Sequence, residues 1–212
     1  MDALKGGAAA IDSSAMFKLS YGLFVLTARE DGRDNGCIIN TAAQITSSPL
    51  MVSVAVNKAG FTHGMILRTG GFALSVLSES APFSLFRRFG FQSGKDTDKF
   101  AGLAYSDRTA SGARFIPEHT NAIIAAKVAQ TAGFPTHTVF FADVTQALTL
   151  SAERSATYQY YFDSIKPKPP QESKKGFVCK VCGYVYEGVS LPKDFVCPLC
   201  RHGAADFEPV KQ

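Results

Sequence analysis

The stretch GFVCKVCGYVYEGVSLPKDFVCPLC, residues 176–200, carries four of the five cysteines of the chain. They form two Cys-x-x-Cys pairs, Cys179 with Cys182 and Cys197 with Cys200. Each pair can point two sulfur atoms at one ion, and the segment between the pairs lets the chain return to complete a tetrahedron. Paired cysteines in a reducing compartment bind metal more often than they form disulfides. Four thiolates select zinc or iron, so the sequence predicts a metal site and leaves the choice of ion open.

The residues around these cysteines resemble rubredoxin. The sequence CKVCGYVYEG followed by DFVCPLC is similar to the two metal-binding loops of that family, with Pro198 inside the second loop. Aromatic residues stand where the family has its core aromatics. They are Tyr184, Tyr186, Phe195 and Phe207. Zinc ribbons share the cysteine spacing but usually lack this aromatic set, so the resemblance implies one iron bound by the four cysteines.

Two features depart from the rubredoxin pattern. The segment between the cysteine pairs is shorter than in free-standing rubredoxins, and Arg201 stands where the family has glycine, although Gly183 is kept. If that position needs a positive φ, arginine costs on the order of 1 kcal/mol there. Its cation near the thiolates would favour Fe(II) and so raise the redox potential. These departures concern the potential and leave metal binding intact.

The composition changes abruptly at Ser164, upstream of the cysteine module. The segment SIKPKPPQESKKG, residues 164–176, is rich in proline, lysine and serine and contains a single large apolar residue. Such a segment packs no core, so we expect a spacer, the alternative being a long surface loop within one domain. The sequence therefore predicts a first domain at residues 1–163, a linker at 164–175 and the cysteine module at 176–212.

The charge pattern narrows the classes of partner. The net charge is +4, and lysine and arginine are scattered among acidic residues, which argues against a nucleic-acid interface. No apolar run reaches the length of a membrane span, and the first residues lack a signal-peptide core. We therefore expect a cytoplasmic protein with neither nucleic acid nor membrane among its partners.

The first domain is predicted to be mainly β. Six segments are rich in β-branched and aromatic residues: 21–30, 36–46, 50–57, 71–77, 122–133 and 137–150. Helices are fewer, with candidates at 14–19, 62–69, 81–89 and 152–162. Closely spaced strands with few helices favour a closed antiparallel barrel. Asp34-Asn35-Gly36 is a candidate hairpin turn, and Cys37, in a predicted strand, is expected to be a small buried apolar residue.

A polar but uncharged run occupies residues 40–49, directly before a predicted strand. Its hydroxyl, amide and backbone groups suit a planar heteroaromatic ligand with carbonyl and ring-nitrogen edges. Further along, Asn57-Lys58 and Thr62-His63 flank a predicted helix start, where backbone N–H groups and a lysine suit a phosphate. Polar loops are common and Thr62 can cap the helix, so these residues alone also allow a purely structural role.

The stretch INTAAQITSSPLMVSVAVNKAGFTHGMI, residues 39–66, resembles the flavin reductase family, which binds FMN in a split β-barrel and forms homodimers. The similarity covers about residues 12–163. It implies that one set of residues faces the isoalloxazine ring and ribityl chain: Asn40, Thr41, Gln44, Thr46, Ser47 and Ser48. It implies that a second set faces the ribityl chain and phosphate: Asn57, Lys58, Thr62 and His63.

Two further segments resemble the same family. The sequence GFPTHTVF, residues 133–140, is similar to the segment before the last barrel strand, where many members place a histidine near the nicotinamide or the flavin edge. The resemblance implies a catalytic role for His137, but Phe-Pro-Thr interrupts the family's Gly-Asp-His order, so a structural histidine is the alternative. The loop FGFQSGK, residues 89–95, implies that Lys95 touches the flavin phosphate or the dimer mate.

The combination of the two parts resembles high molecular weight rubredoxins, the flavin reductase–rubredoxin fusions of anaerobic bacteria. It implies an NAD(P)H-dependent FMN oxidoreductase that passes electrons through its own iron to a flavodiiron protein reducing nitric oxide or oxygen. One alternative is a flavoredoxin-type carrier that another protein reduces. The other is a binding protein, in which a zinc ribbon docks the chain to a partner and the barrel is a structural dimer.

Overall fold

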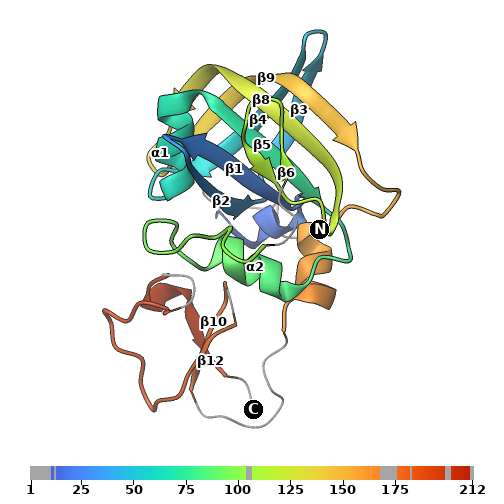
Figure 1. Ribbon diagram of the computed structural model, residues 1–212. Helices are drawn as coiled ribbons and strands as arrows, with labels where there is room; N and C mark the ends of the chain where they lie inside the picture. The colour runs from blue at the N-terminus through green and yellow to red at the C-terminus, as the bar shows by residue number, and fades with distance from the viewer. Residues whose placement is uncertain are drawn as a thin grey trace, which may run out of the picture.

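The computed structural model describes residue 11 and residues 13–103, 107–167, 176–181, 183–198 and 202–210. A larger β domain lies above a smaller C-terminal one (Figure 1). Cys182, Cys200 and Arg201 lie outside the described residues, and so does most of the predicted linker. In the described part of the chain, no helix has the length and apolar character that crossing a membrane would require.

Seven antiparallel strands form the sheet of the larger domain, in the spatial order β2-β1-β5-β8-β9-β4-β3. Their bounds are β1 (Phe24–Glu30), β2 (Arg33–Ile39), β3 (Ala42–Ser47), β4 (Leu50–Asn57), β5 (Gly71–Leu77), β8 (Thr120–Gly133) and β9 (His137–Thr149). Alternate residues of the strands point inward, as in β4, where Val52, Val54 and Val56 are buried. The strands curl around one core with β2 and β3 at the two edges, so the predicted split barrel is confirmed.

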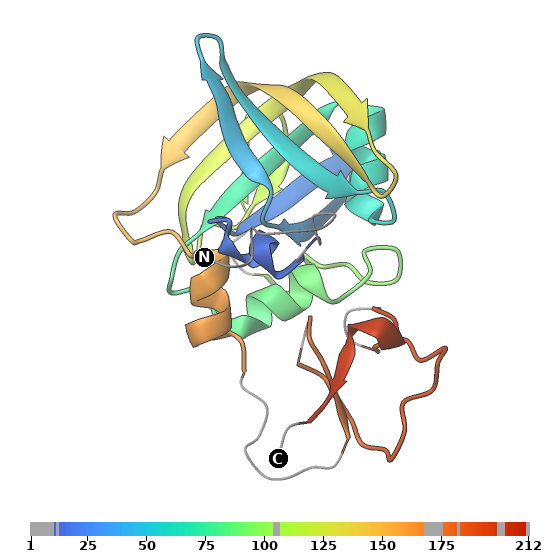
Figure 2. The ribbon, with the colours of Figure 1, turned by 180° about the vertical axis from the view of Figure 1, so that it is seen from behind.

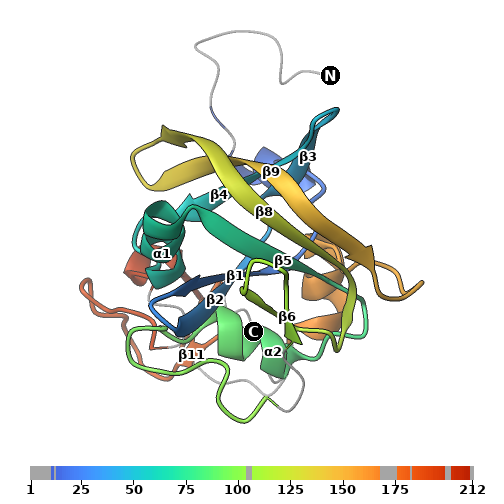
Figure 3. The same ribbon diagram turned by 45° about the horizontal axis from the view of Figure 1, so that its top comes forward.

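Helices cover one edge and one end of this barrel. Helix α1 (Phe61–Thr69) packs against β1 and β2 (Figure 3). Helix α2 (Phe83–Gly90) and the helical segment formed by α3 (Tyr158–Tyr160) and the π-helical turn Tyr161–Ile165 share a second apolar cluster below the barrel. Helix α2 and this helical segment therefore lie between the barrel and the C-terminal domain (Figure 2). The remaining elements are the 3-10 helix Ser13–Lys18, β6 (Asp107–Arg108) and β7 (Arg114–Phe115).

The first hairpin turn differs from the predicted one. The chain turns at Asp31 and Gly32, whose φ angles are +48° and +80°, and not at Asp34-Asn35-Gly36. A two-residue Asp-Gly loop with both φ angles positive matches the twist of the flanking strands, which explains why it wins. Asn35 therefore lies inside β2, opposite Ala28.

Two other local predictions are also corrected. The segment 36–46 was expected to be one strand, but it divides into β2 and β3 at Asn40-Thr41, where the chain crosses from one edge of the split barrel to the other. Helix α1 begins at Phe61 with Gly60 as its N-cap residue and no side-chain cap, so Thr62 does not cap it. The Thr62 hydroxyl instead accepts a buried hydrogen bond from Asn35.

The C-terminal domain contains a three-stranded antiparallel sheet in the order β11-β10-β12. The strands are β10 (Phe177–Cys179), β11 (Val185–Tyr186) and β12 (Phe207–Pro209), and a 3-10 turn, η4 (Ala204–Asp206), precedes the last one. The predicted aromatic set packs around Phe195, whose ring centroid lies 4.7 Å from that of Tyr186 and 5.3 Å from that of Phe207. Tyr184 stacks on Phe195 at 6.4 Å with an interplanar angle of 17°.

Candidate functional site

The two cysteine loops of the C-terminal domain have matching backbone hydrogen bonds. The Cys179 N–H donates to the Tyr184 carbonyl at 2.8 Å, and the Cys197 N–H donates to the His202 carbonyl at 2.8 Å, so each bond spans five residues. Gly183 adopts φ +79° and donates its N–H to the Cys179 carbonyl, which turns the first loop back on itself.

Cys179 and Cys197 are both buried in the same small cluster, 1% and 0% exposed. This burial suits a closed metal site, because thiolates bound to an ion need no water. Within the part of the chain that the structure describes, no three metal-binding side chains come together. The reason is that Cys182 and Cys200, half of the predicted ligand set, lie outside that part, as does Arg201.

The predicted ring-binding residues follow the β3–β4 hairpin from its base to its tip. At the base, the Thr41 hydroxyl donates to the Ala55 carbonyl at 2.7 Å, which ties the entry of β3 to β4. The exposed Gln44 lies halfway along, opposite Val52. Thr46, Ser47 and Ser48 form the tip, where the Ser48 N–H donates to the Thr46 hydroxyl at 3.4 Å. Asn40 precedes the base and is half-buried.

Predicted phosphate-binding residues gather at the other end of β4. Asn57 pairs with His137 in the sheet, and the Lys58 N–H donates to the Thr136 carbonyl at 2.9 Å. His63, buried beside them, shares a 2.8 Å hydrogen bond with Thr138. Burial lowers the pKa of His63, and the neighbouring charges of Lys58 and His137 lower it further. Lys58, His63 and His137 therefore lie close together, and a lysine ammonium beside histidine ring nitrogens fits a phosphate group.

His137 thus lies with the predicted phosphate set, and its Nδ1 atom shares a 2.9 Å hydrogen bond with Thr136. Lys95 lies elsewhere, at the start of β2, where its carbonyl accepts a hydrogen bond from Arg33 at 3.2 Å. The side chain of Lys95 is exposed and lines a polar cavity of ≈ 580 Å³ with Asp34 and Arg114. None of the contacts described for Lys95 joins it to the β3–β4 hairpin.

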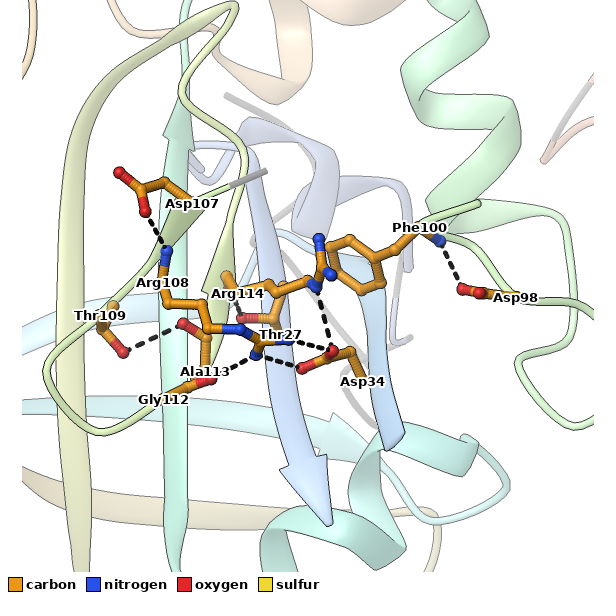
Figure 4. A network of polar contacts seen from close by, with 10 residues as sticks. All are labelled: Thr27, Asp34, Asp98, Phe100, Asp107, Arg108, Thr109, Gly112, Ala113 and Arg114. Atoms are coloured by element: carbon orange, nitrogen blue, oxygen red, sulfur yellow. Dashed lines mark hydrogen bonds and ion pairs between the residues drawn. The ribbon is translucent and has the colours of Figure 1, made fainter. Parts of the chain in front are cut away.

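That polar cavity is organised around Asp34 (Figure 4). Arg108 donates two hydrogen bonds of 2.9 Å to the Asp34 carboxylate, and Arg114 donates one of 3.0 Å. Burial alone would raise the pKa of Asp34, but the bonds and charges of the two arginines hold it below its ordinary value. The network joins β2 to β6 and β7, so its role is to hold these strands together.

A second cavity of ≈ 580 Å³ lies between β2, the start of α1 and the loop after α2. Gly60, Phe61 and Thr62 bring the uncapped N-terminus of α1 to it, and Asn35 lines it as well. The Asn35 side-chain oxygen is buried without a hydrogen-bond partner. An unpaired acceptor beside a helix N-terminus that has no side-chain cap fits a polar ligand such as a flavin nucleotide. We call this space the central cavity.

Asn35 and Lys99 are lining residues that sequence reasoning missed. Lys99 is 4% exposed, and its ammonium donates to the carbonyls of Gly36 and Phe89 at 2.9 and 3.1 Å. Burial lowers the pKa of Lys99. Cys37 is half-buried and lines the cavity beside it, and burial raises the pKa of its thiol. A lysine inside a polar loop and an asparagine in an apparent turn give no signal of burial in the sequence.

Residues of the two cysteine loops line cavities that the larger domain also borders. Pro198, inside the second cysteine pair, lines the central cavity together with Phe91. Val181 and His202 line a smaller apolar cavity of ≈ 190 Å³ that Phe91 also borders. The Lys166 ammonium donates to the Val181 carbonyl at 3.0 Å. The end of the C-terminal domain that carries Val181, Pro198 and His202 therefore faces the larger domain.

The fold and both cysteine loops define a flavin reductase-like protein with a rubredoxin-like domain. The chain belongs to the flavin reductase like domain family, which matches residues 16–168, and residues 177–208 match the rubrerythrin, rubredoxin-like domain. The chain is similar over almost its whole length to the high molecular weight rubredoxin of Moorella thermoacetica. The two are 34% identical over 230 aligned positions, which cover 94% of this chain and 100% of that protein.

Two other known proteins share the larger domain. The ferric-chelate reductase (NAD(P)H) of Archaeoglobus fulgidus is 34% identical over 170 positions, covering 80% of this chain and 100% of that protein. The crystal structure of a flavoredoxin from Methanosarcina acetivorans superposes with a TM-score of 0.59 at 22% identity, covering 68% of this chain and 83% of that one. The latter likeness concerns the fold alone. Together the family and its relatives support oxidoreductase activity.

Proposed function

We propose that this protein is an NAD(P)H-dependent FMN oxidoreductase that passes electrons through its own rubredoxin-type iron to a separate terminal reductase. A flavodiiron protein that reduces nitric oxide or oxygen is the proposed acceptor. Bound FMN would accept hydride from NAD(P)H, and bound iron would supply one-electron Fe(III)/Fe(II) chemistry. The active form is proposed to be a homodimer through the barrel.

One observation carries this proposal. The central cavity is lined by Thr62, a predicted flavin-binding residue, and by Pro198, which lies between two predicted metal ligands. One space thus extends from the start of α1, where Thr62 lies, to the second cysteine loop, where Pro198 lies. The relatives agree, since one is a high molecular weight rubredoxin and another is a reductase that uses NAD(P)H.

The residues of this chain take separate roles in the proposal. Lys58 and His63 hold the FMN phosphate, with Asn57 and Thr62 beside them, and the hairpin residues Asn40 to Ser48 hold the ring and ribityl chain. Cys179, Cys182, Cys197 and Cys200 hold the iron. His137 is proposed to act near the flavin, from its place beside Lys58 at the end of β4. Lys95 would act from the partner subunit or after a movement of its loop.

The proposed dimer is supported by exposed apolar residues around the open edge of the barrel. Ile45 and Leu50 at the β3–β4 tip are 46% and 43% exposed, and Leu148 near the end of β9 is 49% exposed. Large apolar side chains of this kind gather on surfaces that another chain covers.

An absorption spectrum of the native protein, before and after anaerobic NADH, tests the proposal. We expect a flavin spectrum and ferric-thiolate bands that both bleach when NADH is added. A native protein that holds one zinc per chain and no iron would contradict the redox function and support the zinc-ribbon binding protein. Native metal content decides this, because zinc often replaces iron in recombinant rubredoxins.

A flavoredoxin-type carrier reduced by another protein is the second candidate. The observation that favours it is the position of His137, which contacts Thr136 and neighbours Lys58 and His63 within the proposed phosphate set. Stopped-flow mixing with NADH separates the two functions. Rapid flavin bleaching supports the oxidoreductase, whereas a flavin that bleaches only with a reducing partner protein supports the carrier.

A further inference from the structure

The contact between the two domains is made by the metal-binding loops. Val181 lies between Cys179 and Cys182, Pro198 lies between Cys197 and Cys200, and all of these residues belong to the two loops. Val181 and Pro198 line the two cavities that the domains share. The end of the C-terminal domain that carries the predicted metal site is therefore the end that meets the barrel domain.

Phe91 is the barrel-domain residue at the centre of this contact. It follows the last turn of α2, and its N–H donates to the Arg87 carbonyl at 3.2 Å. Its ring lies 5.9 Å from that of Phe83 and packs against the apolar cluster that contains Cys179 and Cys197. Phe91 also lines both shared cavities. One side chain thus borders the central cavity on one side and the cysteine cluster on the other.

Lys166 holds the first metal-binding loop from a second direction. Its ammonium donates to the Val181 carbonyl at 3.0 Å and lies 4.7 Å from the centre of the Phe162 ring. The Lys166 side chain also passes the outside of the loop at Gly183, where an added Cβ would lie 3.4 Å from Lys166 Cε. This charged hydrogen bond restrains the distance between the first cysteine loop and the helical segment that ends at Ile165.

We propose that Phe91 and Lys166 are positioning residues for electron transfer, which dock the metal-binding end of the rubredoxin-like domain on the wall of the central cavity. This inference rests on the proposed function. NADH would become NAD⁺ and release one proton, and its two electrons would leave the flavin one at a time, each reducing the single iron of the chain from Fe(III) to Fe(II), with the acceptor protein reoxidising the iron between the two transfers. The contact covers the metal-binding end, so a separate acceptor protein would reach the iron only after the domains part.

Nuclear magnetic resonance of the full chain tests the docking without any turnover. Iron is paramagnetic and broadens nearby amide signals, whereas the zinc-loaded protein provides a diamagnetic reference. We expect iron to broaden the amides of Gly90 to Gly94 in the native chain, and the Phe91→Ala and Lys166→Gln variants to restore them. Leu67→Ala is the control, because Leu67 is an exposed apolar residue on α1, 57% exposed, away from the contact. Unbroadened amides in the native chain would overturn the proposal.

Reduction of the flavin by light with EDTA as the electron donor tests the transfer without NADH. We expect Phe91→Ala to slow the bleaching of the ferric bands by about tenfold. A loss of about tenfold in the docked population would slow electron transfer by the same factor. In Lys166→Gln, which removes the ammonium that contacts the Val181 carbonyl, ferric bleaching should slow likewise, while flavin reduction by NADH stays within about twofold of the native rate in both variants. Equal ferric bleaching in the native and variant chains would overturn the proposal. Failure of NADH to reduce the native flavin would instead overturn the oxidoreductase function, which the light-driven measurement does not require.

Discussion

The two domains of this chain differ in what can hold them together. In the described residues, the barrel domain has one core cluster of thirteen buried residues and another of eleven, while the C-terminal domain has a cluster of three. Two of those three are Cys179 and Cys197, which are predicted metal ligands. A domain this small buries too little apolar surface to fold alone. We infer that apolar burial stabilises the barrel, and we expect the small domain to depend on its proposed metal for stability.

Cys197→Ser should produce the largest difference in stability between the two domains. Metal binding contributes about 10–16 kcal/mol in small structural metal domains, so loss of one ligand should unfold the C-terminal domain. The barrel should stay folded, because its two large apolar clusters lie within its own domain, and it should lose only the contacts of Phe91 and Lys166 with the cysteine loops. Metal analysis and hydrogen exchange of β10 and β12, compared with β8, measure both effects.

Cys37→Ser is the matched control, since it makes the same chemical change in the barrel domain. It should leave the metal content at one ion per chain and leave exchange in β10 unchanged. Full metal content in Cys197→Ser with a folded C-terminal domain would contradict the metal's role in stability.

The sequence predicted the rubredoxin-like domain and the strand content well because both depend on local patterns. Two close Cys-x-x-Cys pairs need little of the remaining chain to define their geometry, and alternation of apolar residues reports strands directly. The turn at Asp31-Gly32 was missed because Asp34-Asn35-Gly36 offers an equally good local signal. The register of β1 and β2 chooses between them, and it depends on burying Leu26, Ala28 and Ile39 in the barrel core, which residues from many other strands complete.

The same dependence on tertiary packing explains why some residues of the candidate site were not predicted. Asn35 was interpreted as a turn residue, so its buried, unpaired oxygen beside the central cavity could not be foreseen. Lys99 follows a polar loop, and its burial depends on the carbonyls of Gly36 and Phe89, which come from different elements. Resemblance to the family supplied Lys58 and His63, which the structure brings together with His137.

Lys58→Ala should have the next largest effect, and it concerns the barrel alone. Loss of a charged hydrogen bond costs about 1.5–3 kcal/mol, so FMN should bind about 10- to 100-fold more weakly. Riboflavin, which lacks the phosphate, should bind equally well to the native and variant proteins. Flavin fluorescence titration measures both, with Lys127→Ala on the exposed face of β8 as control. Equal weakening for FMN and riboflavin would place the phosphate elsewhere.

Gly94→Ala should lower the stability of the barrel domain at the wall of the central cavity and leave the C-terminal domain folded. A Cβ at Gly94 would lie 2.0 Å from the Asn35 side-chain oxygen, whereas one at Gly71 would meet nothing within 4 Å. Overpacking of this kind costs about 1–3 kcal/mol. Urea unfolding should therefore show a less stable barrel for Gly94→Ala than for the control Gly71→Ala, with the metal content of both unchanged. Equal stabilities would mean that the loop moves aside freely.

The smallest expected effect concerns Asp34, and it tests whether the barrel has a charge-dependent part of its stability. Arg108 and Arg114 hold the pKa of Asp34 below its ordinary value against the opposing effect of burial. A lowered carboxyl pKa stabilises the fold above the unfolded-state value near 3.8, and this stability is lost as the pH falls through the folded-state pKa.

Asp34→Asn should therefore cost about 1–2 kcal/mol at pH 7, a modest value because both arginines are partly exposed. The difference from the native protein should shrink as the pH falls below about 4, where the native carboxylate also becomes neutral. Urea unfolding at several pH values measures this difference in the free energy of unfolding, with hydrogen exchange of β8 as the probe of the barrel. A difference that stays constant with pH would show that Asp34 stabilises the strands through its shape and hydrogen bonds and not through its charge.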